Sequence, residues 1–342
     1  MNVRRRHIST VALTAVAALG FGTLTACSSD SAAAGDTGTF DVVASFYPMA
    51  FLAERIGGEH VHVTSLTQPG QEPHDLEISA RQTAQLEEAD AALYLKGLQP
   101  SVDEAIGQSP IATKIDAAEL TALEEHGTEA GHGEEHGDGH EDEHGHEDEH
   151  GHEDEQAHED EHGHDHDHEG GDPHIWLDPV KYAEVAEGVG KAFQKADPDH
   201  AADYRKNTAT LVKDLEALDE KFRTGLANRT TDVFVTSHAA FGYLAERYGL
   251  TEEAISGLDP DTEPSGARVK ELQKIAKDDG VTTVFYETLV SDKTAKTLAG
   301  DTGLKTDVLD PVEGITDHSR GEDYFQVMEA NLTALRTALG AR

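Results

Sequence analysis

Three histidines occupy places where the chain is expected to pass from a strand into a loop or helix. His74 lies in QPGQEPHDLEIS, His174 lies between two prolines in GDPHIWLDP, and His238 follows the apolar run VFVTS. Taken singly, each histidine fits a capping or packing role, because an isolated His is a weak signal. Together they favour a metal site, because side chains at the carboxyl ends of strands face the ligand-binding rim of α/β proteins and imidazole is a good ligand for Zn²⁺.

A tetrahedral zinc site needs a fourth donor, which a side chain or water supplies. Asp310, in KTDVLDPVEG, follows the last expected strand and is the candidate. An aspartate before a proline also caps turns and helices, and Asp178-Pro179 and Asp259-Pro260 show that this pair recurs in the chain. The choice between Asp310 and water therefore stays open. Glu72, two residues before His74, is a reserve candidate for a water-mediated contact.

A low-complexity stretch separates the first two of these histidines. Residues 124–172 hold 22 acidic residues and no lysine or arginine. With so few apolar residues we expect the stretch to be disordered without metal, and a merely solvating linker is the alternative. Imidazoles and carboxylates favour weak auxiliary metal sites, acting as an antenna, a sensor or a store. The thirteen histidines concerned are His126, His132, His136, His140, His144, His146, His150, His152, His158, His162, His164, His166 and His168.

The N-terminus has the pattern of a bacterial lipoprotein signal. Arg4–Arg6 precede an apolar stretch, residues 8–24, and LTAC ends at Cys27. The apolar stretch contains two glycines and is at the short limit for a bilayer span, which favours a cleaved export segment over a permanent membrane helix. We expect lipidation of Cys27 and an extracytoplasmic, membrane-anchored protein, with the export route left open. Since Cys27 is the only cysteine, a disulfide or a cysteine-ligated metal is excluded once it is acylated.

Charge and length narrow the function further. The formal net charge of −40 disfavours a nucleic-acid partner and favours cations. The 342 residues suffice for about two domains once the N-terminal segment and the low-complexity stretch are set aside. Because no disulfide is expected, the protein must be stabilised by an ordinary hydrophobic core.

The apolar pattern predicts an α/β fold. Runs of strand length alternate with helical segments at residues 40–46, 61–66, 91–95, 111–115, 233–236, 282–286 and 305–309. A helical region at 179–227 reads as one long helix or as two collinear helices broken near Asp197-Pro198, and a last amphipathic helix covers residues 321–339. We expect two lobes, each with a mainly parallel sheet flanked by helices, joined by a long backbone helix, with the metal site between the lobes.

The expected domain boundaries follow from these elements. They are a signal peptide at 1–26, a flexible linker at 27–39, an N-terminal lobe at 40–178 that includes 124–172, a helical spine at 179–227 and a C-terminal lobe at 228–342. An internal sequence repeat supports two related lobes, because the segment 45–57 is similar to the segment 237–249, 192 residues later. The alternative is chance likeness of two amphipathic helices that end in glycine.

The motifs together resemble a known family. The chain resembles the zinc-specific solute-binding proteins of cluster A-I ABC importers, the ZnuA-like group. The features that carry the resemblance are the lipobox, PGQEPHD, the acidic His-rich insertion, DPHIWLDP, TSHAAFGYL and a final LDP followed by GEDYF. The similarity runs from Cys27 to the C-terminus, and DPHIWLDP is its most specific part. It implies ligation by His74, His174 and His238, with Asp310 matching an aspartate that ligates in part of the family. The second-lobe disulfide of some members is absent here.

The resemblance also implies a carrier that captures Zn²⁺ and delivers it to an ABC permease, and we expect a monomer. Manganese-binding relatives have a carboxylate where this chain has His238, and three nitrogens with one oxygen suit zinc better than hard Mn²⁺. Copper would also bind tightly, so affinity alone does not assign the ion. We expect a binding protein rather than an enzyme, because HExxH occurs only within the low-complexity stretch, as HEDEH at 140–144, 146–150 and 158–162. A surface zinc store, a manganese-type protein of the same family and a zinc hydrolase remain alternatives.

Overall fold

The computed structural model describes residues 39–127 and 171–342. The predicted signal peptide, Cys27 and most of the linker lie outside these ranges. So do all the tract histidines except His126. Within the described ranges, no helix is both long enough and apolar enough to cross a membrane.

The N-terminal lobe is built on a four-stranded parallel sheet with strand order β2-β1-β3-β4. Its strands are β1 (Phe40–Ala44), β2 (Val61–Ser65), β3 (Ala91–Tyr94) and β4 (Thr113–Asp116), and its helices are α1 (Tyr47–Gly57), α2 (Ala80–Glu88) and α3 (Pro100–Gln108). Apolar side chains cover both faces of β1, since Val42 packs with α1 and Val43 packs with Leu86 and Ile106 on the opposite side. A parallel sheet needs such cover on both faces.

The C-terminal lobe repeats this topology, with strand order β6-β5-β7-β8, again all parallel. Its elements are β5 (Val233–Thr236), α6 (Gly242–Tyr248), β6 (Thr251–Ala254), α7 (Gly266–Asp278), β7 (Thr283–Tyr286), α8 (Lys293–Thr302), β8 (Lys305–Val308) and α9 (Tyr324–Leu339). Short 3₁₀ helices are η1 (Gly58–His60), η2 (Ala117–Glu119), η3 (Ile175–Leu177) and η4 (Pro198–His200). The predicted fold class of two parallel-sheet lobes is confirmed, while the domain boundaries stay a prediction.

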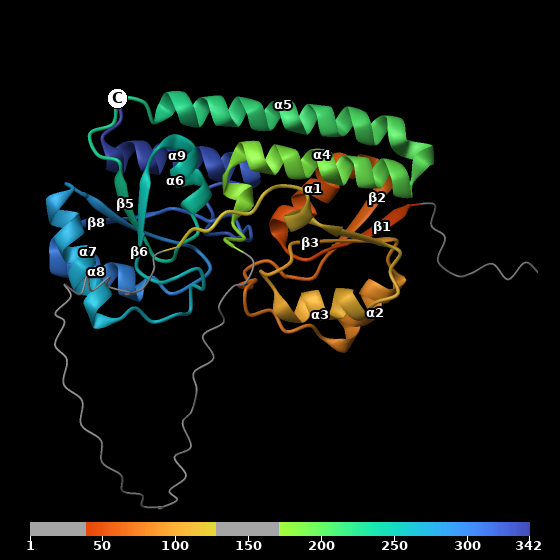
Figure 1. Cartoon of the computed structure of the whole chain (residues 1–342), viewed down its shortest axis with the longest axis horizontal. Helices are drawn as coiled ribbons and strands as arrows, with labels where there is room; N and C mark the ends of the chain where they lie inside the picture. The colour runs from red at the N-terminus through yellow and green to blue at the C-terminus, as the bar shows by residue number, and fades with distance from the viewer. Residues whose placement is uncertain (1–38, 128–170) are drawn as a thin grey trace, which may run out of the picture. The chain divides into compact units, whose positions relative to one another are not determined.

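The helical region between the lobes differs from the expectation of one helix or two collinear helices. Helix α4 (Pro179–Ala196) ends before Pro198, and α5 (Ala201–Gly225) packs back along it as an antiparallel partner (Figure 1). Gly190 permits the close approach, because a Cβ at this position would lie 2.2 Å from Oγ1 of Thr208. The prediction that the two helices are collinear was therefore wrong. The proline break ends the helix, but the direction taken afterwards is decided by packing of the two apolar faces.

Helix α5 contacts both lobes along its 25 residues. Arg55 of α1 pairs with Asp214 at 2.8 Å near the middle of α5, and Lys221 pairs with Glu329 of α9 at 2.5 Å near the C-terminal end of α5. These exposed ion pairs add little stability. The stronger link is the apolar core, which is continuous from α1 through α5 to α9.

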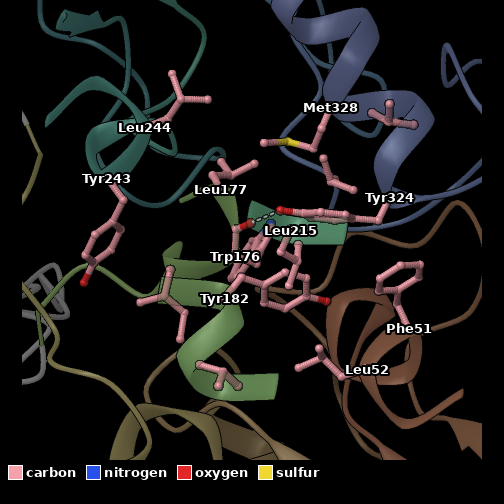
Figure 2. Close-up of a cluster of buried hydrophobic side chains, with 14 of the residues drawn as sticks. Phe51, Leu52, Trp176, Leu177, Tyr182, Leu215, Tyr243, Leu244, Tyr324 and Met328 are labelled. Atoms are coloured by element: carbon pink, nitrogen blue, oxygen red, sulfur yellow. Dashed lines mark hydrogen bonds between the residues drawn. The ribbon is translucent and has the colours of Figure 1, made fainter. Parts of the chain in front are cut away.

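Figure 2 shows the centre of this core, where aromatic side chains from both lobes meet. Tyr324 of α9 lies 5.4 Å from the ring of Phe51 in α1 and 4.8 Å from that of Tyr182 in α4. Its hydroxyl donates a hydrogen bond to the carbonyl of Trp176 at 2.6 Å. Burial of such large side chains contributes about 1.5–3 kcal/mol each, so pulling the lobes apart at this core is costly.

Candidate metal centre

Four loops bring four side chains to one point, and three of these loops follow the carboxyl ends of strands. His74 lies in the loop between β2 and α2, His174 directly precedes η3, His238 follows β5, and Glu313 follows β8. The candidate ligand atoms of these four residues all lie within 4.8 Å of one another. The side chain of His74 is 6% exposed and the other three are at most 1% exposed. The structure thus groups the three predicted histidines and adds Glu313; we call these four residues the His₃Glu group.

The distances within the His₃Glu group fit a tetrahedral metal ion. Oε1 of Glu313 lies 3.4 Å from Nε2 of His74, 3.4 Å from Nε2 of His174 and 3.7 Å from Nε2 of His238. Zinc bonds of about 2.0–2.1 Å at tetrahedral angles place neighbouring donors about 3.3 Å apart. One ion at the centre of the group would therefore reach all four donors with small adjustments.

Several polar atoms of the group have no hydrogen-bond partner in the described part of the chain. They are Nε2 of His174, Nε2 of His238 and Oε2 of Glu313. Buried polar atoms of this kind are rare because desolvation without a partner is costly, and an unplaced ion is one accepted reason for them. A bound cation would satisfy the two nitrogens and offset the carboxylate charge.

The Nδ1 atoms of two histidines are held by carboxylates outside the group. His174 Nδ1–H donates to Asp172 at 2.7 Å, and the backbone N–H of His174 donates to the same oxygen at 2.9 Å. His238 Nδ1–H donates to Glu287 at 2.7 Å, and Ser237 also donates to Glu287, at 2.6 Å. Such partners fix the tautomer that leaves Nε2 free and aim the ring at the metal.

The group is electrostatically coupled when no metal is bound. Burial alone would lower the pKa of His174, but Asp172 and Glu313 raise it to about 10. The pKa of His238 is also raised, because Glu287 and Glu313 outweigh burial. Burial alone would raise the pKa of Glu313, but the neighbouring imidazoles hold it well below its usual value. A metal ion entering at neutral pH must therefore displace protons from imidazole.

Glu72 is a neighbour of the His₃Glu group rather than one of its members. Burial raises the pKa of Glu72 to about 7, and the charge of Glu313 adds to this while His74 opposes it. One of its oxygens accepts the backbone N–H of Asp75 at 3.3 Å. The predicted water-mediated contact of Glu72 with a metal stays a prediction.

Asp310 is likewise not in the group, and its carboxylate is engaged elsewhere. One oxygen accepts the N–H of Val312 at 2.8 Å and the other accepts the hydroxyl of Thr288 at 3.1 Å. Val312 has φ of 59°, an uncommon value for a β-branched residue, so this turn needs outside support. Asp310 supplies it and thereby directs Glu313, three residues later, toward the three histidines.

Two further side chains hold the turn. Asn331 of α9 accepts the N–H of Asp310 at 2.9 Å and donates to its carbonyl at 2.7 Å. The indole N–H of Trp176 donates to the carbonyl of Pro311 at 2.7 Å. The loops carrying His174 and Glu313 are therefore tied together by Trp176. In the sequence, the only sign of Glu313 is its place in DPVEG, shortly after the last strand.

Two parallel-sheet lobes around a buried group of three imidazoles and a carboxylate define the class of metal-binding solute-binding proteins. The chain belongs to the ZnuA family, described as the periplasmic component A of a zinc-uptake complex, whose model matches residues 42–338. The resemblance inferred from the motifs is thereby confirmed.

Individual relatives agree with this assignment. The chain is 34% identical over 319 residues to the zinc-binding lipoprotein AdcA of Streptococcus pneumoniae, covering 92% of this chain and 58% of that protein. It is 34% identical to the high-affinity zinc uptake system protein ZnuA of Bacillus subtilis, covering 87% of each. Among solved structures, the Zn(II)-bound ZnuA-like domain of S. pneumoniae AdcA matches with a TM-score of 0.67 and 30% identity, over 88% of this chain and 99% of that one. The chain thus spans only 58% of the length of AdcA.

Proposed function

We propose that this protein captures Zn²⁺ outside the cytoplasm and delivers it to an ABC permease. The observation that carries the proposal is the buried His₃Glu group, whose donor atoms have the separations that tetrahedral zinc requires. The names of the related proteins, which refer to zinc binding and zinc uptake, support it.

The donor set favours zinc over harder ions. Three nitrogens and one carboxylate suit Zn²⁺, whereas Mn²⁺ prefers oxygen donors and a larger coordination number. The same donors would bind Cu²⁺ tightly by the Irving–Williams order. Selection of zinc therefore depends on tetrahedral geometry and on which metal is available.

The group fits a carrier better than an enzyme. Catalytic zinc sites keep one position open for water or substrate, whereas four protein donors fill the tetrahedron here. The donors come from loops of both lobes, so movement of these loops would remove ligands and release the ion. Because the apolar core joins the lobes, we infer release by loop movement rather than by wide hinge opening.

The location and partners follow from the N-terminal pattern and the family. We propose a monomer that is anchored to the cell membrane by lipid on Cys27 and is exposed on the extracytoplasmic side, where it meets the permease. The word lipoprotein in the name of the AdcA relative supports the anchor.

Zinc titration of the full chain against a competing chelator tests the proposal. A carrier binds one equivalent far more tightly than the rest, and the same protein should support uptake of radiolabelled zinc by cells that hold the permease. A store binds many equivalents with similar affinity. Absence of a distinct tight equivalent would overturn the carrier proposal.

A further inference from the structure

A second set of metal-ligating side chains lies where the acidic histidine tract joins the folded protein. Glu124, His126 and Glu246 place their candidate ligand atoms within 4.8 Å of one another. Nε2 of His126 is hydrogen-bonded to Oε2 of Glu246 at 2.9 Å and lies 3.9 Å from Oε2 of Glu124. The side chains are 14%, 38% and 63% exposed for His126, Glu124 and Glu246 respectively. We call this set the tract-foot cluster.

Well-packed groups hold His126 in this cluster. Its Nδ1–H donates to Asp172 at 3.0 Å, which leaves Nε2 facing the two glutamates. The ring packs edge-on against Tyr243 with centroids 4.4 Å apart. Gly242 makes room for the ring, because a Cβ there would lie 2.4 Å from Cβ of His126. The imidazole is thus positioned as a ligand would be, with its far nitrogen oriented by a carboxylate.

Backbone hydrogen bonds fix Glu124 in a similar way. Its N–H donates to the hydroxyl of Tyr243 at 2.8 Å, and its carbonyl accepts the N–H of Asp172 at 2.8 Å. Lys181 pairs with one carboxylate oxygen at 2.5 Å, while the other oxygen faces His126. Glu246 adds a second negative charge beside the first. Lys181 offsets only one of the two carboxylates, and a divalent cation bound to Nε2 of His126 would replace its hydrogen bond to Glu246 and offset both charges.

The cluster is open to solvent and yet connected to the buried site. A groove of about 450 Å³ is lined by His126, Glu246 and Glu252, among others. Asp172 is fully buried; one of its oxygens accepts from His126 and the other from His174, at 2.7 Å. A single carboxylate therefore orients one imidazole in each metal-ligating set.

We propose that the tract-foot cluster is a second zinc site, which binds Zn²⁺ more weakly than the His₃Glu group and exchanges it with the solvent side of the protein. One nitrogen and two carboxylate oxygens on partly exposed side chains leave a position for water. Fewer nitrogen donors and greater exposure give lower affinity and faster release. The site lies at the start of the tract and is one carboxylate away from the ring of His174.

Anomalous diffraction at the zinc absorption edge, on crystals of the full chain with excess zinc, tests the site directly. We expect one peak at the His₃Glu group and a second between Nε2 of His126 and the carboxylates of Glu124 and Glu246. His126→Ala should abolish the second peak and keep the first. His140→Ala is the matched control, since it also removes one tract histidine but should leave both peaks in place.

Exchange is tested in solution with Glu246→Gln, which keeps the contact between His126 and Asp172. We expect this variant to load the His₃Glu group about three- to tenfold more slowly when zinc is limiting, with its final affinity changed less than about threefold, because only the exposed ligands are altered. Three outcomes would overturn this inference and leave the carrier function intact. They are a peak at the His₃Glu group with none at the tract-foot cluster, an unchanged tract-foot peak in His126→Ala, and an unchanged loading rate in Glu246→Gln. Loss of the first peak from the wild-type protein would instead overturn the proposed carrier function.

Discussion

The His₃Glu group and the tract-foot cluster use the same donor types in opposite surroundings. In the first, every side chain is at most 6% exposed and two rings are fixed through Nδ1. In the second, Glu246 is 63% exposed and only one imidazole is present. Because His126 is also oriented through its Nδ1, the two sets differ mainly in burial and in the number of nitrogen donors. These two features would separate a site for retention from the proposed site for exchange.

The largest expected effect comes from removing a buried imidazole. His238→Ala should weaken the tight zinc site at least about 100-fold, or about 2.7 kcal/mol, because one of three nitrogen donors is lost from a buried tetrahedral site. Chelator competition measures this. His318→Ala, at an exposed histidine outside both sets, is the control and should leave the affinity unchanged. Equal affinity of His238→Ala and wild type would exclude a site between the lobes.

The next comparison separates a ligand from the residue that positions it. Glu313→Gln should lower zinc affinity about 10- to 100-fold, since it replaces a charged donor by a neutral one. Asp310→Asn should lower it less, about tenfold or below, because Asp310 acts through the turn at Val312. Both variants are measured by the same competition assay. A larger loss in Asp310→Asn than in Glu313→Gln would reverse the assignment.

Acidification should weaken the tight site over a wide pH range. The metal-free protein has a raised pKa at His174, about 10, so at neutral pH this imidazole carries a proton that zinc must displace. Each displaced proton lowers the apparent affinity about tenfold for each pH unit below the pKa. Affinity should therefore fall continuously from alkaline pH through neutrality. A flat affinity between pH 9 and 7 would show that the metal-free group is not protonated.

Deleting residues 128–168 should have a smaller effect on the tight site. The deletion removes twelve tract histidines but leaves every member of the His₃Glu group and of the tract-foot cluster. We expect loss of weak equivalents, slower capture at low ionic strength, and a change of less than about tenfold in the tight dissociation constant. Chelator competition on deletion and full-length protein gives the answer. A larger change would mean that the deleted segment supplies a ligand.

The smallest expected signal is a change in the emission of Trp176, the only tryptophan. Its side chain is fully buried, and its ring lies 5.2 Å from that of His174. Replacement of the His174 proton by zinc should alter the emission intensity with little shift in wavelength, because exposure of the indole stays the same. Fluorescence titration up to one equivalent measures this change. An unchanged intensity would contradict the proposed exchange of proton for metal at His174.

Much of the fold could be predicted from apolar periodicity, and its failures have specific causes. Strand β6 was missed because its sequence, TEEA, lacks the apolar run that marks a buried strand, as is common at sheet edges. The antiparallel arrangement of α4 and α5 was missed because helical periodicity does not report the direction of the chain after a break. Both features depend on contacts between segments distant in sequence.

The candidate site shows the same limit at smaller scale. His74, His174 and His238 were recognisable from their places after strands and beside prolines. Glu313 was not, because the positive φ of Val312 decides which carboxylate of the turn points inward. Asp310, the nearer acid, is used to make that turn. Local sequence identified the turn but not the direction of its side chains.

The hydrogen bond between Asp172 N–H and the carbonyl of Glu124 closes a neck at the two ends of the acidic tract. Gly171 is required beside this hydrogen bond for two reasons. Its φ of 82° is unfavourable for other residues, and a Cβ would lie 2.9 Å from the carbonyl oxygen of Glu124. Because the ends are already joined, doubling the length of the inserted segment costs only about 0.6 kcal/mol. The neck is therefore a natural insertion point, where a reporter domain could replace the tract and convert the protein into a genetically encoded zinc sensor.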